Sequence, residues 1–119
     1  IFSAEGGVDI NQIAQEKEEA VVQRAVPISR GLELGDARRM CRQVGLKGKD
    51  LNEIPGILVK LYEVFRNNDA TLAEINPLVK TKKGEYIALD SKVEIDDSGL
   101  YRHTELGFDQ IERITNPLE

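Results

Sequence analysis

Residues 70–94, ATLAEINPLVKTKKGEYIALDSKVE, place two apolar runs on either side of residues 82–84 (KKG). A three-residue hairpin loop is a type I turn followed by a left-handed residue, and glycine adopts that conformation without steric cost. Gly84 stands at this third position. The stretch therefore predicts a β-hairpin whose closing residues, Thr81 and Glu85, face each other.

This loop fixes the register of the hairpin. Counting back from the turn sets Asn76 opposite Asp90 and Glu74 opposite Lys92, and residues in register share one side of the sheet. The alternate side is mostly apolar and carries the pairs Val79–Ile87, Pro77–Leu89 and Ile75–Ser91. We expect an α+β fold in which a small, mostly antiparallel sheet has its helices packed on the face of Ile75, Val79, Ile87 and Leu89.

A two-residue loop, Lys83-Gly84, gives a competing register. It would set Asn76 opposite Ser91 and would move Asp90 to the other side of the sheet. We rank it second because a type I′ turn prefers Asn, Asp or Gly at its first position, where this chain has Lys83.

The pair Asn76 and Asp90 is a candidate divalent-metal site. Mg²⁺ takes oxygen ligands, usually one or two from the protein, and completes an octahedron with water and substrate phosphates. The alternative is that Asn76-Pro77 and Asp90 only mark strand ends, and spacing alone leaves both readings open. For Glu74, spacing favours an ordinary ion pair with Lys92 across the ladder.

The composition excludes several classes of protein. The 119 residues suit one domain, and the net charge of −5, with both signs spread along the chain, argues against a nucleic-acid binder. No apolar run of the ~18 residues needed to span a membrane is present. Cys41, the single cysteine, cannot form an internal disulfide, so we expect a reducing, cytosol-like compartment and a buried Cys41.

The remaining segments predict short strands and two main helices. We expect a strand ending at residue 4, a turn at Glu5-Gly6-Gly7 whose glycines permit positive backbone angles or close approach of another chain, and a strand over 20–27. Asp36 is expected to cap a helix over 37–44. A longer helix over 51–67 is expected to begin late because of Pro55. Two polar helices are predicted over 11–19 and 106–113.

Four segments resemble the β subunit of succinyl-CoA synthetase, also called succinate–CoA ligase. They are SAEGGVDI at 3–10, VGLKGK at 44–49, EINPLV at 74–79 and LDSK at 89–92, and the resemblance runs from residue 1 to about residue 116. It implies an ATP-grasp fold and a ligase that joins succinate to CoA using ATP or GTP. It also implies that Asn76 and Asp90 bind Mg²⁺, although the family commonly has LDGK where this chain has Ser91.

The resemblance implies a partner and a mechanism. In the family a histidine of the α subunit is phosphorylated before succinyl phosphate and succinyl-CoA form, and Glu74 would support catalysis by contacting that histidine loop. His103, the only histidine here, lies in a polar stretch and is not expected to act as a nucleophile. We expect a cytoplasmic protein, or a mitochondrial-matrix protein in a eukaryote. Neither a nucleic acid nor a membrane is expected as a partner.

The resemblance also sets expectations about domain organisation. Residues 1–119 would form the second nucleotide-binding subdomain, with the other ATP-grasp subdomain and the C-terminal CoA-ligase domain outside the chain, so we expect the chain alone to be inactive. It opens without Met, as if inside a strand, and its final Leu118-Glu119 resembles a vector scar. Malate–CoA ligase, ATP-citrate lyase and a non-catalytic docking module remain alternatives.

Overall fold

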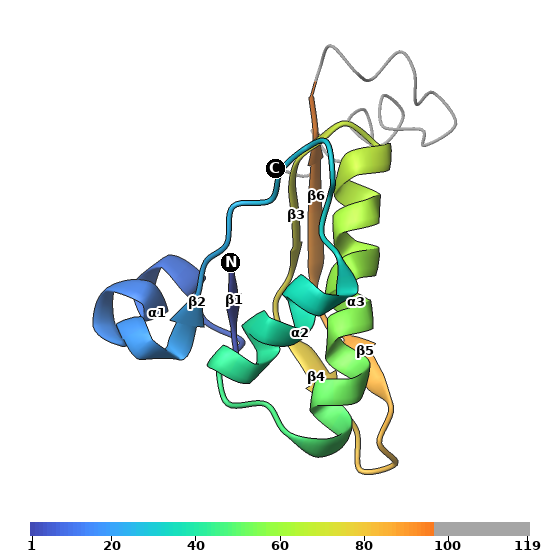
Figure 1. The fold of residues 1–119 in the computed structure, drawn as a ribbon. Helices are drawn as coiled ribbons and strands as arrows, with labels where there is room; N and C mark the ends of the chain where they lie inside the picture. The colour runs from blue at the N-terminus through green and yellow to red at the C-terminus, as the bar shows by residue number, and fades with distance from the viewer. Residues whose placement is uncertain (97–119) are drawn as a thin grey trace, which may run out of the picture.

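The computed structural model describes residues 1–96, and its longest element is a central helix. Figure 1 shows this helix, α3, lying along the β3–β6 ladder, with α2 across it and a small N-terminal unit to one side. The elements in chain order are β1 (Phe2–Ser3), α1 (Ile10–Glu16), the 3-10 turn η1 (Glu18–Ala20), β2 (Val21–Val22), α2 (Leu34–Gln43), α3 (Gly48–Asn67), β3 (Ala70–Ile75), β4 (Leu78–Lys80), β5 (Tyr86–Ala88) and β6 (Ser91–Ile95).

The hairpin has the register set by the three-residue loop. β4 pairs with β5 antiparallel, and Val79 lies opposite Ile87. β3 pairs with β6 antiparallel, with Glu74 opposite Lys92. Gly84 has φ +85° and donates its N–H to the Thr81 carbonyl at 2.9 Å, which closes the type I turn. The first prediction is therefore confirmed, and the two-residue loop is excluded.

The ladder changes character at Asn76-Pro77, whose peptide bond is cis. Asn76 donates its N–H to the Asp90 carbonyl at 3.0 Å, and the Pro77 carbonyl accepts the Leu89 N–H at 3.1 Å. Successive residues of a regular strand direct their backbone groups to opposite sides, but here two neighbours both point to the partner strand. The pairing of residues across the ladder is the same on both sides of this point. The regular alternation of side chains between the two faces of the sheet is interrupted there.

This break makes one sequence-based expectation wrong. Lys80 and Tyr86 reach Asp50 of α3, so in the β4–β5 half the helix covers their side of the ladder. Ile87 and Leu89, expected beneath a helix, are 43% and 64% exposed. Counting straight through residues 76 and 77 assigns the wrong face because the alternation of a strand is not continuous there.

The two main helices begin earlier than the sequence indicated. α2 starts at Leu34, so Asp36 lies in its first turn as a buried residue and is not its cap. α3 starts at Gly48 and includes Pro55, which is fully buried, so the expected late start is also wrong. The C-terminal end of α2 is as predicted, with Gly45 at φ +91°.

The N-terminal unit is smaller than expected. β1 pairs with β2 over two residues each, and the strand predicted over 20–27 covers only Val21–Val22. Arg24, in the middle of the predicted strand, instead forms an ion pair with Asp36 of α2 at 2.8 Å. The turn at Gly7 has φ +79°, as the sequence predicted, and α1 overlaps the helix predicted over 11–19 but begins one residue earlier.

The core lies where α2, α3 and β3 pack together. Cys41 and Ala37 have no exposed surface, as predicted for the cysteine, and Met40 is also buried. No helix among residues 1–96 is long and apolar enough to cross a bilayer. The predicted helix over 106–113 and His103 lie outside the described residues.

Candidate metal centre

Asn76 is held by a loop from the far end of the chain. Its Oδ1 accepts the N–H of Gly7 at 2.7 Å, and its Nδ2 donates to the carbonyl of Val8 at 2.8 Å. The two contacts join residues that lie 69 and 68 positions apart in the sequence. The amide is therefore fixed in orientation, because a backbone N–H must meet its oxygen and a carbonyl must meet its nitrogen.

The Asn76 oxygen retains capacity for a cation. A carboxamide oxygen has two lone pairs, and the Gly7 N–H uses one of them. The structure thus presents a neutral oxygen whose direction is set by the protein backbone. This arrangement fits the chemistry of an Mg²⁺ ligand.

Asp90 supplies the charged half of the pair. Its carbonyl accepts the Asn76 N–H at 3.0 Å, so the two residues are directly opposed in the ladder. Its side chain is exposed, and within residues 1–96 its carboxylate makes no hydrogen bond or ion pair. Residues 1–96 contain no group of three His, Cys, Asp or Glu side chains that could hold a metal ion. A cation bound by Asn76 and Asp90 would therefore take its remaining ligands from water and phosphate.

Glu74 does not form the expected ion pair. It lies opposite Lys92 in the ladder, as predicted, but the Lys92 ammonium pairs with Glu94 at 3.1 Å. Between residues 1 and 96 no ion pair involves Glu74. Lys92 thus pairs with its i+2 neighbour on the same strand.

Sequence reasoning missed a polar cluster that fixes the hairpin to α3. The Asp50 carboxylate accepts from the Tyr86 hydroxyl at 2.7 Å and pairs with the Lys80 ammonium at 3.0 Å. The hydrogen bond from Tyr86, and next the bond from Lys80, hold the pKa of Asp50 below its usual value. Loss of surrounding water, followed by the bond to Asp50, raises the pKa of Tyr86 to about 12.

The predicted register already sets Lys80 opposite Tyr86. It did not indicate that both residues contact Asp50 of α3. Lys49 adds a second attachment, because its ammonium donates to the Gly84 carbonyl. The same ammonium lies 5.7 Å from the centre of the Tyr86 ring. The N-terminal turn of α3 thereby holds the tip and both strands of the hairpin.

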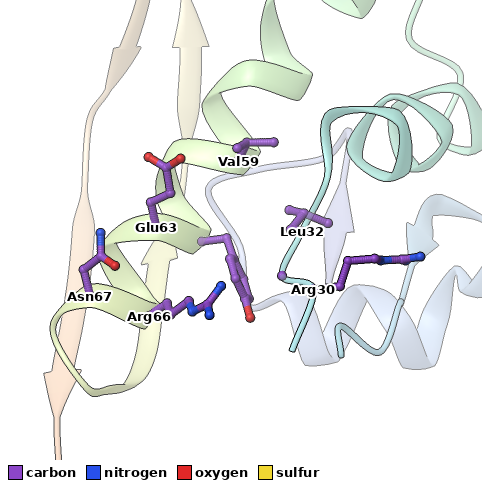
Figure 2. Close-up of a pocket in the computed structure, with 8 residues that line it drawn as sticks. Arg30, Leu32, Val59, Glu63, Arg66 and Asn67 are labelled. Atoms are coloured by element: carbon purple, nitrogen blue, oxygen red, sulfur yellow. The ribbon is translucent and has the colours of Figure 1, made fainter. Parts of the chain in front are cut away.

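A pocket between α3 and the loop before α2 is separate from this centre. Figure 2 shows residues that line it: Glu63, Arg66 and Asn67 come from α3, and Arg30 and Leu32 come from the loop before α2. Its volume is about 440 Å³, and none of its lining residues belongs to the hairpin. Arg30 is already paired with Asp36 and Glu33, at 3.2 Å in both cases. This pocket therefore offers nothing to the Asn76–Asp90 pair.

Comparison with known proteins agrees with the sequence and the fold. Residues 1–80 match the ATP-grasp domain family. The chain is 40% identical over 119 residues to the GDP-forming succinate–CoA ligase β subunit of Thermus thermophilus, covering 100% of this chain and 31% of that protein. ADP-forming β subunits of Persephonella marina and Thioalkalivibrio sulfidiphilus are 40% and 44% identical over 104 residues, or 87% of this chain and 27% of each relative. The chain thus spans about a third of these relatives or less, and it belongs to the ATP-grasp family.

Proposed function

We propose that this chain is the part of an ADP- or GDP-forming succinate–CoA ligase β subunit that binds the magnesium–nucleotide complex, with Asn76 and Asp90 as the protein ligands. Membership of the ATP-grasp family and the similarity to β subunits of that name support the proposal. The direct opposition of Asn76 and Asp90 carries it, because the backbone bond keeps the two residues adjacent, and we infer that the Asn76 amide oxygen and the Asp90 carboxylate converge on one cation.

The two side chains make an oxygen-only donor set. Asp90 supplies the single negative charge, and Asn76 supplies a neutral oxygen that the Gly7 N–H holds in direction. When bound, Mg²⁺ would neutralise phosphate charge during phosphoryl transfer. One charge from the protein suits a site that must also accept anionic phosphates, because a larger cluster of carboxylates would repel them.

The proposal extends to the partner chain. An α subunit would present the histidine that is phosphorylated, and we propose that Glu74, which has no ion pair with Lys92, contacts that loop. Succinate and CoA would bind in other parts of the complete enzyme. We assign such an enzyme to the cytoplasm, or to the mitochondrial matrix in a eukaryote.

The direct test is cation binding by this chain in the presence of ATP. We expect Mn²⁺ to broaden the resonances of Asn76 and Asp90 selectively. Asp90→Asn should weaken binding at least 10-fold, because it removes the charge and retains the volume. Glu85→Gln is the matched control, since Glu85 is an exposed carboxylate at the turn end of the same hairpin. Equal affinities in both variants would contradict the metal site and favour a docking module.

A second test uses the complete ligase that contains this chain. Asp90→Asn should slow formation of the phosphohistidine while circular dichroism shows an unchanged fold. Glu74→Ala should slow the same step without changing Mn²⁺ affinity. Unaltered phosphorylation in the Glu74 variant would remove that residue from the mechanism. Assays with succinate, malate and citrate then separate succinate–CoA ligase from the malate–CoA ligase and ATP-citrate lyase alternatives.

A further inference from the structure

The loop Glu5-Gly6-Gly7-Val8 and the Asn76-Pro77 corner fit each other closely. Gly7 donates its N–H to the Asn76 oxygen at 2.7 Å, and Val8 accepts from the Asn76 nitrogen at 2.8 Å. A neighbouring N–H and C=O of one loop thus match the two ends of one carboxamide. Sequence reasoning predicted a turn with positive angles or close approach of another chain here, but did not connect it with Asn76.

The orientation of a carboxamide decides whether it can bind a cation. Its oxygen and its NH₂ group have nearly the same shape, and a half-turn about the last side-chain bond exchanges them. After such a turn, the Asn76 NH₂ would face the Gly7 N–H, and its oxygen would face the Val8 carbonyl. Both hydrogen bonds would be lost, and like partners would oppose each other.

We propose that Gly7 and Val8 are positioning residues for Asn76, and that their backbone groups keep Oδ1 directed as a metal ligand. The inference rests on the proposed function of Asn76 and adds the element that prepares it. Groups that orient a metal ligand through hydrogen bonds affect affinity nearly as strongly as the ligands themselves.

Gly6 gives the loop its access to the corner. A Cβ on Gly6 would lie 2.9 Å from the Cβ of Pro77 and 3.5 Å from its Cα. The proline ring is rigid and cannot turn aside. Only glycine therefore allows the loop to approach closely enough for its neighbour, Gly7, to reach Asn76. Gly7 itself has open space around its Cα but a φ of +79°.

Contacts on both sides of the loop hold it in place. The Ser3 hydroxyl accepts the Glu5 N–H at 3.0 Å, and Glu5 pairs with Lys17 at 3.1 Å. After the loop, the Asp9 carboxylate accepts the Asn11 N–H at 2.9 Å and caps α1. The loop is thereby anchored independently of Asn76, which is the property that a positioning element needs.

The experiment compares Gly6→Ala with Gly56→Ala in the full chain. Gly56 lies in α3, and an added Cβ there meets nothing within 4 Å, so it controls for the substitution itself. The first readout needs no metal. Gly6→Ala should shift the Asn76 side-chain amide resonances and increase hydrogen exchange of the Gly7 amide. The second readout is Mn²⁺ affinity with ATP present, which should fall about 10- to 100-fold.

The outcomes separate this inference from the metal site itself. If Asp90→Asn weakens Mn²⁺ binding but Gly6→Ala moves the Asn76 resonances without changing affinity, the positioning role is wrong and the site stands. If Asp90→Asn has no effect on affinity, the proposed function is wrong. If Gly6→Ala does not fold, hydrogen exchange of the Gly7 amide is measured in the unaltered chain. Exchange at the rate of an unprotected peptide would overturn the inference. Slow exchange that becomes fast in Asn76→Ala would support it.

Discussion

The Tyr86 hydroxyl donates a hydrogen bond to the Asp50 carboxylate at 2.7 Å, and this bond ties β5 to the N-terminal turn of α3. Lys80 reaches the same carboxylate from β4, the other strand of the ladder. One acidic side chain therefore holds both strands near the turn. The consequences for titration follow directly.

We expect Tyr86 to lose its proton far later than an ordinary tyrosine. Its pKa is raised from 10.0 to about 12, by loss of surrounding water and then by the bond to Asp50. Because the folded pKa exceeds the unfolded one, this contribution to stability is complete below about pH 10 and is lost as pH rises towards 12. Tyrosinate absorbance should show one late component, which Tyr86→Phe removes and Asp50→Asn moves to lower pH. A late component that persists in Tyr86→Phe would contradict this assignment.

Gly84→Val should destabilise the hairpin. A β-branched residue at φ +85° costs about 1–2 kcal/mol in the free energy of unfolding, measurable by urea denaturation. Gly84→Asn is the control because asparagine tolerates left-handed angles, while both substitutions add a Cβ next to the flexible Lys49 side chain. Equal losses in the two variants would show that contact with Lys49, rather than backbone conformation, sets the cost.

Asp36→Asn should lower the free energy of unfolding by about 1.5–3 kcal/mol. The Asp36 side chain is only 5% exposed and pairs with Arg24 at 2.8 Å and Arg30 at 3.2 Å. Glu33→Gln serves as the control, because Glu33 also pairs with Arg30 but is 57% exposed, and such surface pairs contribute about 0–1 kcal/mol. A larger loss for Glu33→Gln would reverse our ranking of the two carboxylates.

Cys41 should resist thiol reagents in the folded chain. Burial raises the pKa of its thiol from 9.0 to about 11, and its exposed surface is zero. The raised pKa means that the protonated thiol favours the folded state below about pH 9, and that this preference is lost as pH rises towards 11. Ellman's reagent should react at the rate of unfolding in buffer and rapidly in urea. Rapid labelling in buffer would contradict the burial of Cys41.

The features that could be predicted from sequence depend on local chemistry. Gly84 fixes a three-residue loop, and the loop fixes the pairs from Lys80–Tyr86 back to Leu72–Glu94, including Asn76 with Asp90. The positive backbone angle expected at the first turn was confirmed at Gly7, which has φ +79°. In each case, the deciding interactions join residues near in sequence or follow from a single backbone conformation.

The features that could not be predicted depend on distant partners. Asn76 meets Gly7 across 69 residues, and no periodicity indicates that contact. Asp36 has the sequence features of a helix cap, but it is buried and forms ion pairs with Arg24 and Arg30 of the preceding loop. The buried face of β4 was also mistaken, because Asp50 on another element determines which side of that strand faces the helix.

One register runs through the hairpin on both sides of the break at residues 76 and 77. Deleting one residue from β4 or β5 would therefore slide Asp90 past Asn76 and separate the two oxygen donors. Extra residues at the exposed tip, Lys82-Lys83, would replace the three-residue loop that Gly84 closes by its bond to Thr81. The number of residues between Asn76 and Asp90 is therefore as much a requirement of the cation site as the two side chains themselves.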